Sequence, residues 1–220
     1  AITGSYGKTS TKDILAHILS TRYKVLKTPM SFNTPMGLCK VIRGELKSEH
    51  EIFIVELGAR NKGDIKKLCE LVNPEIGIIT AIGPQHLEMF KTLENIRDTK
   101  YELIESLPYN GTAVFNNDDE HCKYLANITK DKKVLLYGIN KGDAKLYLSA
   151  ANISMDHQGI AFMAQNSKGS PVSYQCKLLG RHNISNILAA STVALELGMS
   201  LTEVSAAVKT LEQSPHRLQL

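Results

Sequence analysis

The sequence predicts a three-layer α/β fold, in which helices cover both faces of a mostly parallel sheet and a small antiparallel β-subdomain is attached. Three observations lead to this prediction. A glycine-rich turn at residues 3–9 leads into a helical pattern, short apolar segments then alternate with helical ones, and hairpin-type turns separate alternating segments beyond residue 146. Segments as apolar as residues 52–55 are typical of parallel strands that are buried on both sides.

The first part of the chain follows the order strand, loop, helix, strand. Apolar residues at helical spacing predict a helix over residues 8–19, and a short strand is expected at 23–28. Further strands are expected at 52–55, 76–80 and 112–115. Further helices are expected at 62–71 and 93–107.

The second part of the chain changes pattern. Alternating segments at 146–153, 159–164 and 172–178 predict an antiparallel β insertion at roughly 143–178. Two helices are expected after it, at 183–197 and 201–211. Gly198 is expected to end the first of them, and Thr202 to be the N-cap of the second. Residues 1–220 are therefore expected to form one domain.

The most specific motif is the turn that ends in Gly7-Lys8-Thr9, because turns of this kind hold nucleotide phosphates. Lys8 would reach the phosphate oxygens and the Thr9 hydroxyl could ligate Mg²⁺, while backbone N–H groups and the helix N-terminus attract the anion. Ile2 stands where the general pattern has glycine, so the loop belongs to a variant class. The alternative is a glycine-rich turn that contains Lys-Thr by chance. The residues expected to bind ATP or GTP here are Thr3, Gly4, Ser5, Tyr6, Gly7, Lys8, Thr9 and Ser10.

The composition agrees with an intracellular enzyme domain. Of 220 residues, 43% are hydrophobic, which suffices for a sizeable core, and no apolar run is long enough to cross a bilayer. The net charge of +4 is spread along the chain, so nucleic acid is not an expected partner. The four cysteines lie far apart without a Cys-x-x-Cys pair, which argues against structural zinc and disulfides and fits a reducing cytoplasm.

Three further residues are candidates for metal binding: two follow the carboxyl ends of strands, where α/β sheets gather their ligands, and the third lies in the expected helix at 93–107. Glu56 follows one expected strand and is a candidate Mg²⁺ ligand, and His86 follows the next and could ligate a second metal. A lysine held partly neutral by burial can react with CO₂ to form a carbamate, which would make Lys100 a metal-binding carboxylate. The alternatives are a surface glutamate, a solvated histidine and an exposed lysine paired with a neighbouring glutamate.

Asn183 and Asn186 lie one turn apart on one face of an expected helix. An amide side chain offers both a donor and an acceptor, which suits the edge of an adenine. The alternative for Asn183 is that it caps the helix.

In their order, these motifs resemble the central ATPase domain of the Mur ligases over essentially the whole chain. The segments that carry the resemblance are residues 3–9, 56–59, 83–88, 100, 116–119, 182–186 and 216–218. Glu-Leu-Gly-Ala at 56–59 and His-Leu-Glu at 86–88 are most similar to the family members that add D-alanyl-D-alanine to UDP-N-acetylmuramoyl-tripeptide. Tyr6 departs from the family, which often has Asn or Ser there, and residues 31–37 are only similar to its Asn-rich substrate loop.

The resemblance implies that ATP phosphorylates a substrate carboxylate and that an amine then displaces the phosphate from the acyl phosphate. It implies that Thr9 and Glu56 hold one Mg²⁺, and that Glu56, His86 and carbamylated Lys100 hold a second. The catalytic residues expected on this basis are Lys8, Glu56, His86 and Lys100.

The resemblance further implies that Asn183 and Asn186 face the adenine, with Asn186 the better candidate, and that Arg217 contacts ATP. It places a UDP-sugar domain before this chain and a Rossmann-like domain after it, so that the chain by itself would bind MgATP weakly and not ligate. The expected partners of the full-length, monomeric enzyme are a UDP-N-acetylmuramoyl-peptide and a D-amino-acid dipeptide. Two alternatives stay open, namely a sister ligase that acts on folates or cyanophycin and a non-catalytic nucleotide-binding module.

Overall fold

The computed structural model describes residues 1–29, 32–85, 87–139, 146–167 and 169–212. The elements in chain order are β1 (Ile2–Thr3), α1 (Lys8–Leu19), β2 (Val25–Lys27), α2 (Pro35–Gly44), β3 (Ile52–Ile54), α3 (Asp64–Val72), β4 (Ile76–Ile79), α4 (Leu87–Phe90), α5 (Leu93–Glu105), β5 (Thr112–Asn116), α6 (Glu120–Ile128), β6 (Lys133–Gly138), β7 (Leu148–Asp156), β8 (Gly159–Asn166), β9 (Val172–Cys176), α7 (His182–Glu196) and α8 (Leu201–Lys209).

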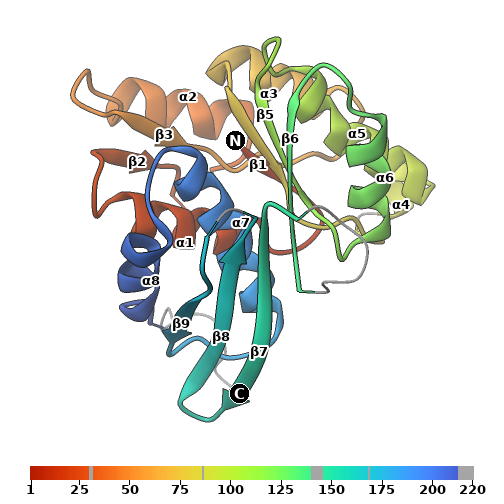
Figure 1. The fold of residues 1–220 in the computed structure, drawn as a ribbon. Coiled ribbons are helices and arrows are strands. Elements are labelled where there is room, and N and C mark those ends of the chain that lie inside the picture. The colour runs from red at the N-terminus through yellow and green to blue at the C-terminus, as the bar shows by residue number, and fades with distance from the viewer. Residues whose placement is uncertain (30–31, 86, 140–145, 168, 213–220) are drawn as a thin grey trace.

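One sheet runs through the molecule in the order β1-β4-β5-β6-β7-β8-β9, with β2 and β3 paired in parallel beside it (Figure 1). The pairs from β1 to β7 are parallel, and β8 and β9 are added antiparallel. A bridge between Ile2 and Glu56 joins the end of β3 to β1. The expected α/β fold is confirmed, and the antiparallel strands continue the parallel sheet because β7 pairs directly with β6.

Two apolar cores cover the two faces of this sheet, because neighbouring strand residues point to opposite sides. Ile78 packs with α1, α7 and α8, whereas Ile79 packs with α2, α3, α5 and α6. Figure 1 shows α1 and α8 on one side of the parallel strands and α3, α5 and α6 on the other. The three-layer arrangement leaves the carboxyl ends of the strands as one edge at which loops converge.

Several elements differ from those expected from sequence. Helices α2, α4 and α6 and strand β6 were not among the expected elements. The N-cap of α8 is Ser200 and not Thr202, because the Ser200 side chain accepts from the Glu203 N–H while the Glu203 carboxylate accepts from the Ser200 N–H. This capping box satisfies two backbone N–H donors at once. A cap at Thr202 would leave both of them without these hydrogen bonds.

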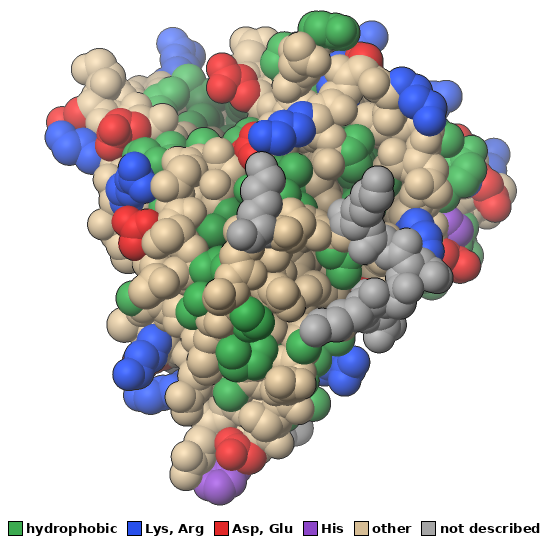
Figure 2. Space-filling view, viewed as in Figure 1, with side chains coloured by type: hydrophobic (Ala, Val, Ile, Leu, Met, Phe, Trp, Pro, Cys, Tyr) green, Lys and Arg blue, Asp and Glu red, His purple; other side chains and the backbone are tan. Residues whose placement is uncertain are grey.

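The surface carries charges of both signs. In Figure 2, the Lys and Arg side chains of that face are interspersed with Asp and Glu around its rim and do not gather into one patch. None of the helices within the described residues has the length and apolar character needed to cross a membrane.

Candidate active site

The phosphate loop runs from the end of β1 to the start of α1 and contains two glycines with positive φ. Gly4 has a φ of 148°, and Gly7, which precedes α1, has a φ of 79°. A Cβ on Gly4 would collide with the Thr80 hydroxyl, and a Cβ on Gly7 would lie 2.6 Å from Asn186 Oδ1. Only glycine fits at either position, so the loop packs directly on the residue after β4 and on α7.

Lys8 reaches back across this loop. Its Nζ donates to the carbonyl oxygens of Gly4 (2.9 Å) and Ser5 (3.2 Å). Burial lowers the pKa of Lys8, and the negative charge of Glu56 opposes that shift. A positive charge is thus held at the turn, beside the N-terminus of α1 and half-buried Thr9. This arrangement suits a phosphate, because the free N–H groups of a first helical turn attract anions.

Other side chains of the loop are engaged within the protein. Thr3 Oγ1 donates to the Leu57 carbonyl (3.1 Å), and Ser5 Oγ donates to the Gly83 carbonyl (2.9 Å). Tyr6 is 54% exposed at the tip of the loop. Of the residues expected to bind ATP, Thr3 and Ser5 therefore turn their hydroxyls away from the turn that Lys8 spans.

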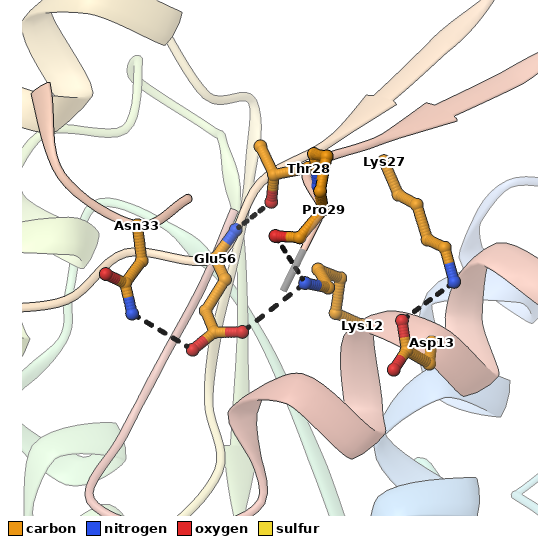
Figure 3. Close-up of polar contacts among 7 residues, drawn as sticks. All are labelled: Lys12, Asp13, Lys27, Thr28, Pro29, Asn33 and Glu56. Atoms are coloured by element: carbon orange, nitrogen blue, oxygen red, sulfur yellow. Dashed lines mark hydrogen bonds and ion pairs between the residues drawn. The ribbon is translucent and has the colours of Figure 1, made fainter. Parts of the chain in front are cut away.

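Glu56 lies two residues beyond β3 and is almost fully buried. Figure 3 shows its carboxylate between Asn33 and Lys12: Asn33 Nδ2 donates to Oε1 (3.3 Å), and Lys12 Nζ lies 3.5 Å from Oε2. The Lys12 ammonium also donates to the Pro29 carbonyl at 3.4 Å. The contact of Lys12 with Oε2 is an ion pair without hydrogen-bond geometry, so Oε2 receives no hydrogen bond from any described residue.

Lys100 lies in α5 and is only 4% exposed. Burial, with the nearby charge of Lys8 as a second cause, lowers the pKa of Lys100 to about 8. Glu102, a possible partner for an exposed lysine, instead accepts from the N–H groups of Gly63 (2.7 Å) and Lys66 (3.1 Å) at the start of α3. Lys100 has no ion pair with another residue that the structure describes, so its amine is neutral more often than that of an ordinary lysine.

The charge of Glu56 acts on Lys8, and the charge of Lys8 acts on Lys100, so Lys8 lies near both of these expected site residues. Within the described ranges, no three side chains of His, Cys, Asp and Glu gather as a metal site. A buried carboxylate oxygen without a hydrogen-bond donor nevertheless fits a hard cation, since such ions take oxygen ligands. The expected sites His86 and Arg217 lie outside the described residues.

The two asparagines of α7 are hydrogen-bonded to each other, and their other contacts differ. Asn186 Oδ1 accepts from the Thr11 hydroxyl (3.3 Å), and Asn186 Nδ2 donates to Asn183 Oδ1 (3.1 Å). Asn183 in turn donates to the Leu179 carbonyl at 2.7 Å, and the N-cap of α7 is Arg181 rather than Asn183. Asn186 thus lies against the phosphate loop.

A groove of about 650 Å³ lies between α1 and the start of α7. Among the residues that line it are Ser10, Asp13, Ile14, Leu178, His182 and Asn183. The groove begins at Ser10, next to the phosphate loop, and its walls combine apolar side chains with charged groups and an amide, so a planar base with polar edges could fit there.

Two residues near the loop were not predicted. Lys12 lies four residues after Lys8, so it is on the same face of α1 one turn later, and this spacing was a readable signal. Thr80 Oγ1 lies 2.6 Å from the Tyr6 carbonyl and 3.2 Å from that of Thr3, as a shared donor. Nothing in the sequence distinguishes Thr80 from any threonine after a strand.

A glycine turn between a strand and a helix, with a lysine at the turn and a buried carboxylate after a neighbouring strand, defines a nucleotide-binding domain of the phosphate-loop class. Residues 2–194 match the Mur ligase middle domain, and the chain belongs to this family.

The chain is similar to UDP-N-acetylmuramoyl-tripeptide–D-alanyl-D-alanine ligase of Mycobacterium tuberculosis, with 34% identity over 100% of this chain and 42% of that protein. The structure is similar to that of MurF from Acinetobacter baumannii, with a TM-score of 0.90 and 28% identity over 99% of this chain and 46% of that one. It is also similar to MurF ligase from Thermotoga maritima in complex with ADP, with a TM-score of 0.86 and 28% identity over 98% and 48% of the two chains. This chain spans slightly less than half the length of these relatives.

Proposed function

We propose that this chain is the middle domain of a ligase that uses ATP to join D-alanyl-D-alanine to UDP-N-acetylmuramoyl-tripeptide. The observation that carries the proposal is the phosphate loop beside a buried, incompletely paired carboxylate, Glu56, and a buried lysine, Lys100. A domain that only bound nucleotide would not need such groups next to the phosphates. The printed names of the relatives supply the two substrates, and the structure in complex with ADP supports the choice of nucleotide.

The nucleotide is proposed to lie along the N-terminus of α1. Lys8 and the N–H groups of the first turn would bind the β- and γ-phosphates, while Asn183 would face the base in the groove. Asn186, whose amide is hydrogen-bonded to Thr11 and Asn183, would instead pack against Gly7 of the phosphate loop. Ser10 lines the same groove, and we keep Arg217 as a proposed ATP contact.

The residues present fit Mg²⁺, since Glu56 has a buried oxygen without a hydrogen-bond donor. Thr9 and Glu56 would hold one ion, and Glu56, His86 and carbamylated Lys100 a second; such ions would neutralise charge on the phosphates. The neutral Lys100 amine would attack the carbon of CO₂, form the N–C bond and release one proton to water.

The reaction that this site would support has two steps. A carboxylate oxygen of the UDP-linked peptide attacks the γ-phosphorus, the bond to the bridging oxygen breaks, and ADP leaves with that electron pair. The amine of the dipeptide then attacks the acyl carbon, phosphate leaves, and the amine nitrogen loses a proton. Lys8 stabilises the charge that moves with the phosphoryl group, which is the type of contribution that dominates such reactions.

The test is phosphate release by the full-length protein with MgATP, UDP-N-acetylmuramoyl-tripeptide and D-alanyl-D-alanine, each omitted in turn. Release that needs all three supports the proposal, and Lys8→Ala should abolish it. Lys123→Ala, an exposed lysine on α6, is the matched control and should leave the rate unchanged. Release only with another carboxylate and amine would assign a sister ligase, and nucleotide binding without release would assign a binding module. We expect the full-length enzyme to be a cytoplasmic monomer.

A further inference from the structure

The tip of the phosphate loop is fastened to the segment that follows β4. Three hydrogen bonds join Ser5 to this segment: the Ser5 N–H donates to the Ala81 carbonyl (2.7 Å), its hydroxyl donates to the Gly83 carbonyl (2.9 Å), and the Gly83 N–H donates back to the hydroxyl (3.0 Å). The remaining polar group of Ser5, its carbonyl, accepts from Lys8. Ser5 is 2% exposed, and all its polar groups are therefore used inside the protein.

The ring of Tyr6 closes over the same contact. A Cβ on Gly83 would lie 2.6 Å from Tyr6 Cε2 and 3.4 Å from Tyr6 Cζ, so the ring rests on the bare Cα of this glycine. The Tyr6 carbonyl is held separately by the Thr80 hydroxyl, at 2.6 Å. The aromatic ring thus lies against the backbone of the same glycine whose N–H and carbonyl are bonded to the Ser5 hydroxyl.

The other side of the segment is held by α6. The Ile82 N–H donates to Asp119 Oδ2 (3.0 Å), while Asp119 Oδ1 accepts from Cys122 as the N-cap of the helix. Residues 81–83 are consequently fixed between two anchors, the helix cap on one side and Ser5 on the other. Removal of the Ser5 hydroxyl would leave the Asp119 anchor and the bond from the Ser5 N–H to Ala81, and would release Gly83.

We infer that Ser5 is a positioning residue, which fixes the wall formed by residues 81–83 relative to the phosphate loop, and that it does not itself bind phosphate. The inference rests on the proposed function in that the wall would stand beside the γ-phosphate, where the substrate carboxylate must approach in line. Nucleotide affinity would come instead from Lys8 and the first turn of α1, and loss of the Ser5 hydroxyl leaves in place the backbone carbonyl that Lys8 contacts. Loss of the hydroxyl should therefore slow the reaction without weakening the nucleotide complex.

The test compares Ser5→Ala with the wild type in the full-length protein. We expect kcat for ligation to fall about 10- to 100-fold, because residues 81–83 would no longer be held in the position that the reaction needs. The Kd for MgADP should change by less than about threefold. Amide hydrogen exchange at Ile82 and Gly83 should become about tenfold faster, because both hydrogen bonds between the Ser5 hydroxyl and Gly83 are lost. Thr192→Val, which removes a buried hydroxyl bonded to the Leu188 carbonyl at 2.8 Å in α7, is the matched control and should change none of the three.

A second variant approaches the contact from its other side and keeps the test valid if Ser5→Ala does not fold. Gly83→Ala should displace the Tyr6 ring and slow ligation to a similar degree, and adding Tyr6→Ala should restore most of the lost rate by removing the clash. A double variant as slow as Gly83→Ala alone would contradict the ring contact.

Two results would overturn the inference. One is a Kd for MgADP about tenfold weaker in Ser5→Ala with kcat unchanged, which would make Ser5 a direct nucleotide contact. The other is unchanged exchange at Ile82 and Gly83. Both binding and exchange are measurable without any ligation, so failure of the wild type to ligate would count against the proposed function and leave these two measurements to decide the role of Ser5.

Discussion

The two sides of the candidate site differ in how completely their polar groups are paired. On the loop side, Ser5, Thr80 and Asn186 hold the phosphate loop through short hydrogen bonds and close packing. On the charged side, Glu56 and Lys12 meet at 3.5 Å while both are almost fully buried, and Lys100 has no ion-pair partner among the described residues. A buried charge that is poorly paired is destabilising.

The difference indicates that the two sides have different roles in binding the ligand. The loop side is already hydrogen-bonded and closely packed in the protein alone, so we expect it to bind phosphate with little rearrangement. The charged side carries an energetic cost in the protein alone, which a bound cation and phosphate would offset.

The largest effect is expected for Lys100→Ala on the charged side. If Lys100 acts as a carbamate, kcat for ligation should fall about 1,000-fold, the size of effect seen when one preorganised charged group is lost. Phosphate release measures this, and added formate or acetate should restore part of the rate by replacing the missing carboxylate. A variant with nearly wild-type activity would remove Lys100 from the catalytic residues.

The next effect concerns the buried ion pair. Lys12→Met leaves Glu56 as an uncompensated buried charge and should lower the free energy of unfolding by roughly 3 kcal/mol. Lys27→Met is the control, because the Lys27–Asp13 pair in Figure 3 has a shorter distance of 2.8 Å but side chains 45% and 36% exposed, and it should cost less than about 1 kcal/mol. Urea unfolding of the chain measures both.

The double variant Lys12→Met/Glu56→Gln completes the comparison. Removing both charges should restore part of the stability lost in Lys12→Met, because no uncompensated charge then remains buried. Equal losses in Lys12→Met and Lys27→Met would contradict the distinction between buried and exposed pairs.

A pH effect of similar size is expected from Lys100. The pKa of this lysine is 10.5 in an ordinary environment and about 8 in the folded protein. Below pH 8 both states bind the proton and the folded state carries the full burial cost, which is roughly 3 kcal/mol. Between these two pKa values the unfolded chain keeps a proton that the folded chain has released, so the free energy of unfolding should rise with pH.

The measurement is urea unfolding at pH 7–11 in CO₂-free buffer, for the wild type and for Lys100→Met. The rise attributed to Lys100 should be absent from the variant, whose side chain does not titrate. Parallel curves for the two proteins would show that burial does not depress the pKa of Lys100.

The smallest effect is expected on the loop side. Gly4→Ala places a Cβ at positive φ and against Thr80, and it should lower the free energy of unfolding by roughly 2 kcal/mol. Gly44→Ala, at the end of α2 with nothing within 4 Å of its Cβ position, should be neutral or stabilising by up to about 1 kcal/mol. Thermal unfolding distinguishes them, and a Gly4→Ala protein as stable as Gly44→Ala would show that the loop is not tightly packed.

Features that depend on a few neighbouring residues could be predicted from the sequence. The loop at residues 3–9 and the helix after it were recognisable because Gly7-Lys8-Thr9 and the helical spacing occur within a few residues. The capping box of Ser200 and Glu203 is equally local, because the Ser-x-x-Glu pattern is present in the sequence and favours Ser200 over Thr202 as the N-cap. Helix α2 was missed because only Leu38 and Val41 are fully buried in it, which gives a weak apolar period.

Contacts between distant segments could not be predicted. Lys12 meets Glu56 only because α1 packs beside the end of β3. In α7, Asn186 lies against Gly7, and Asn183 donates to the Leu179 carbonyl. The burial of Lys100 is hidden by the charged residues around it in α5. The spacing of apolar residues shows which face of a helix or strand is apolar. It does not show which polar side chain a neighbouring element buries.

The pairing of β1 with β4 has a consequence for the order of folding. Ile2 aligns with Ile78, whereas β7 and β8 are joined by a tight turn at residues 156–159. Closing a long segment of chain is slower than closing a hairpin, so we expect the β7–β8 hairpin to form early and β1 to join the sheet late. Pulse-labelled hydrogen exchange during refolding would test this, and early protection of Ile78 would contradict it. A nucleotide would then recognise only chains that have completed their folding, because the loop takes shape when the last parallel strand is in place.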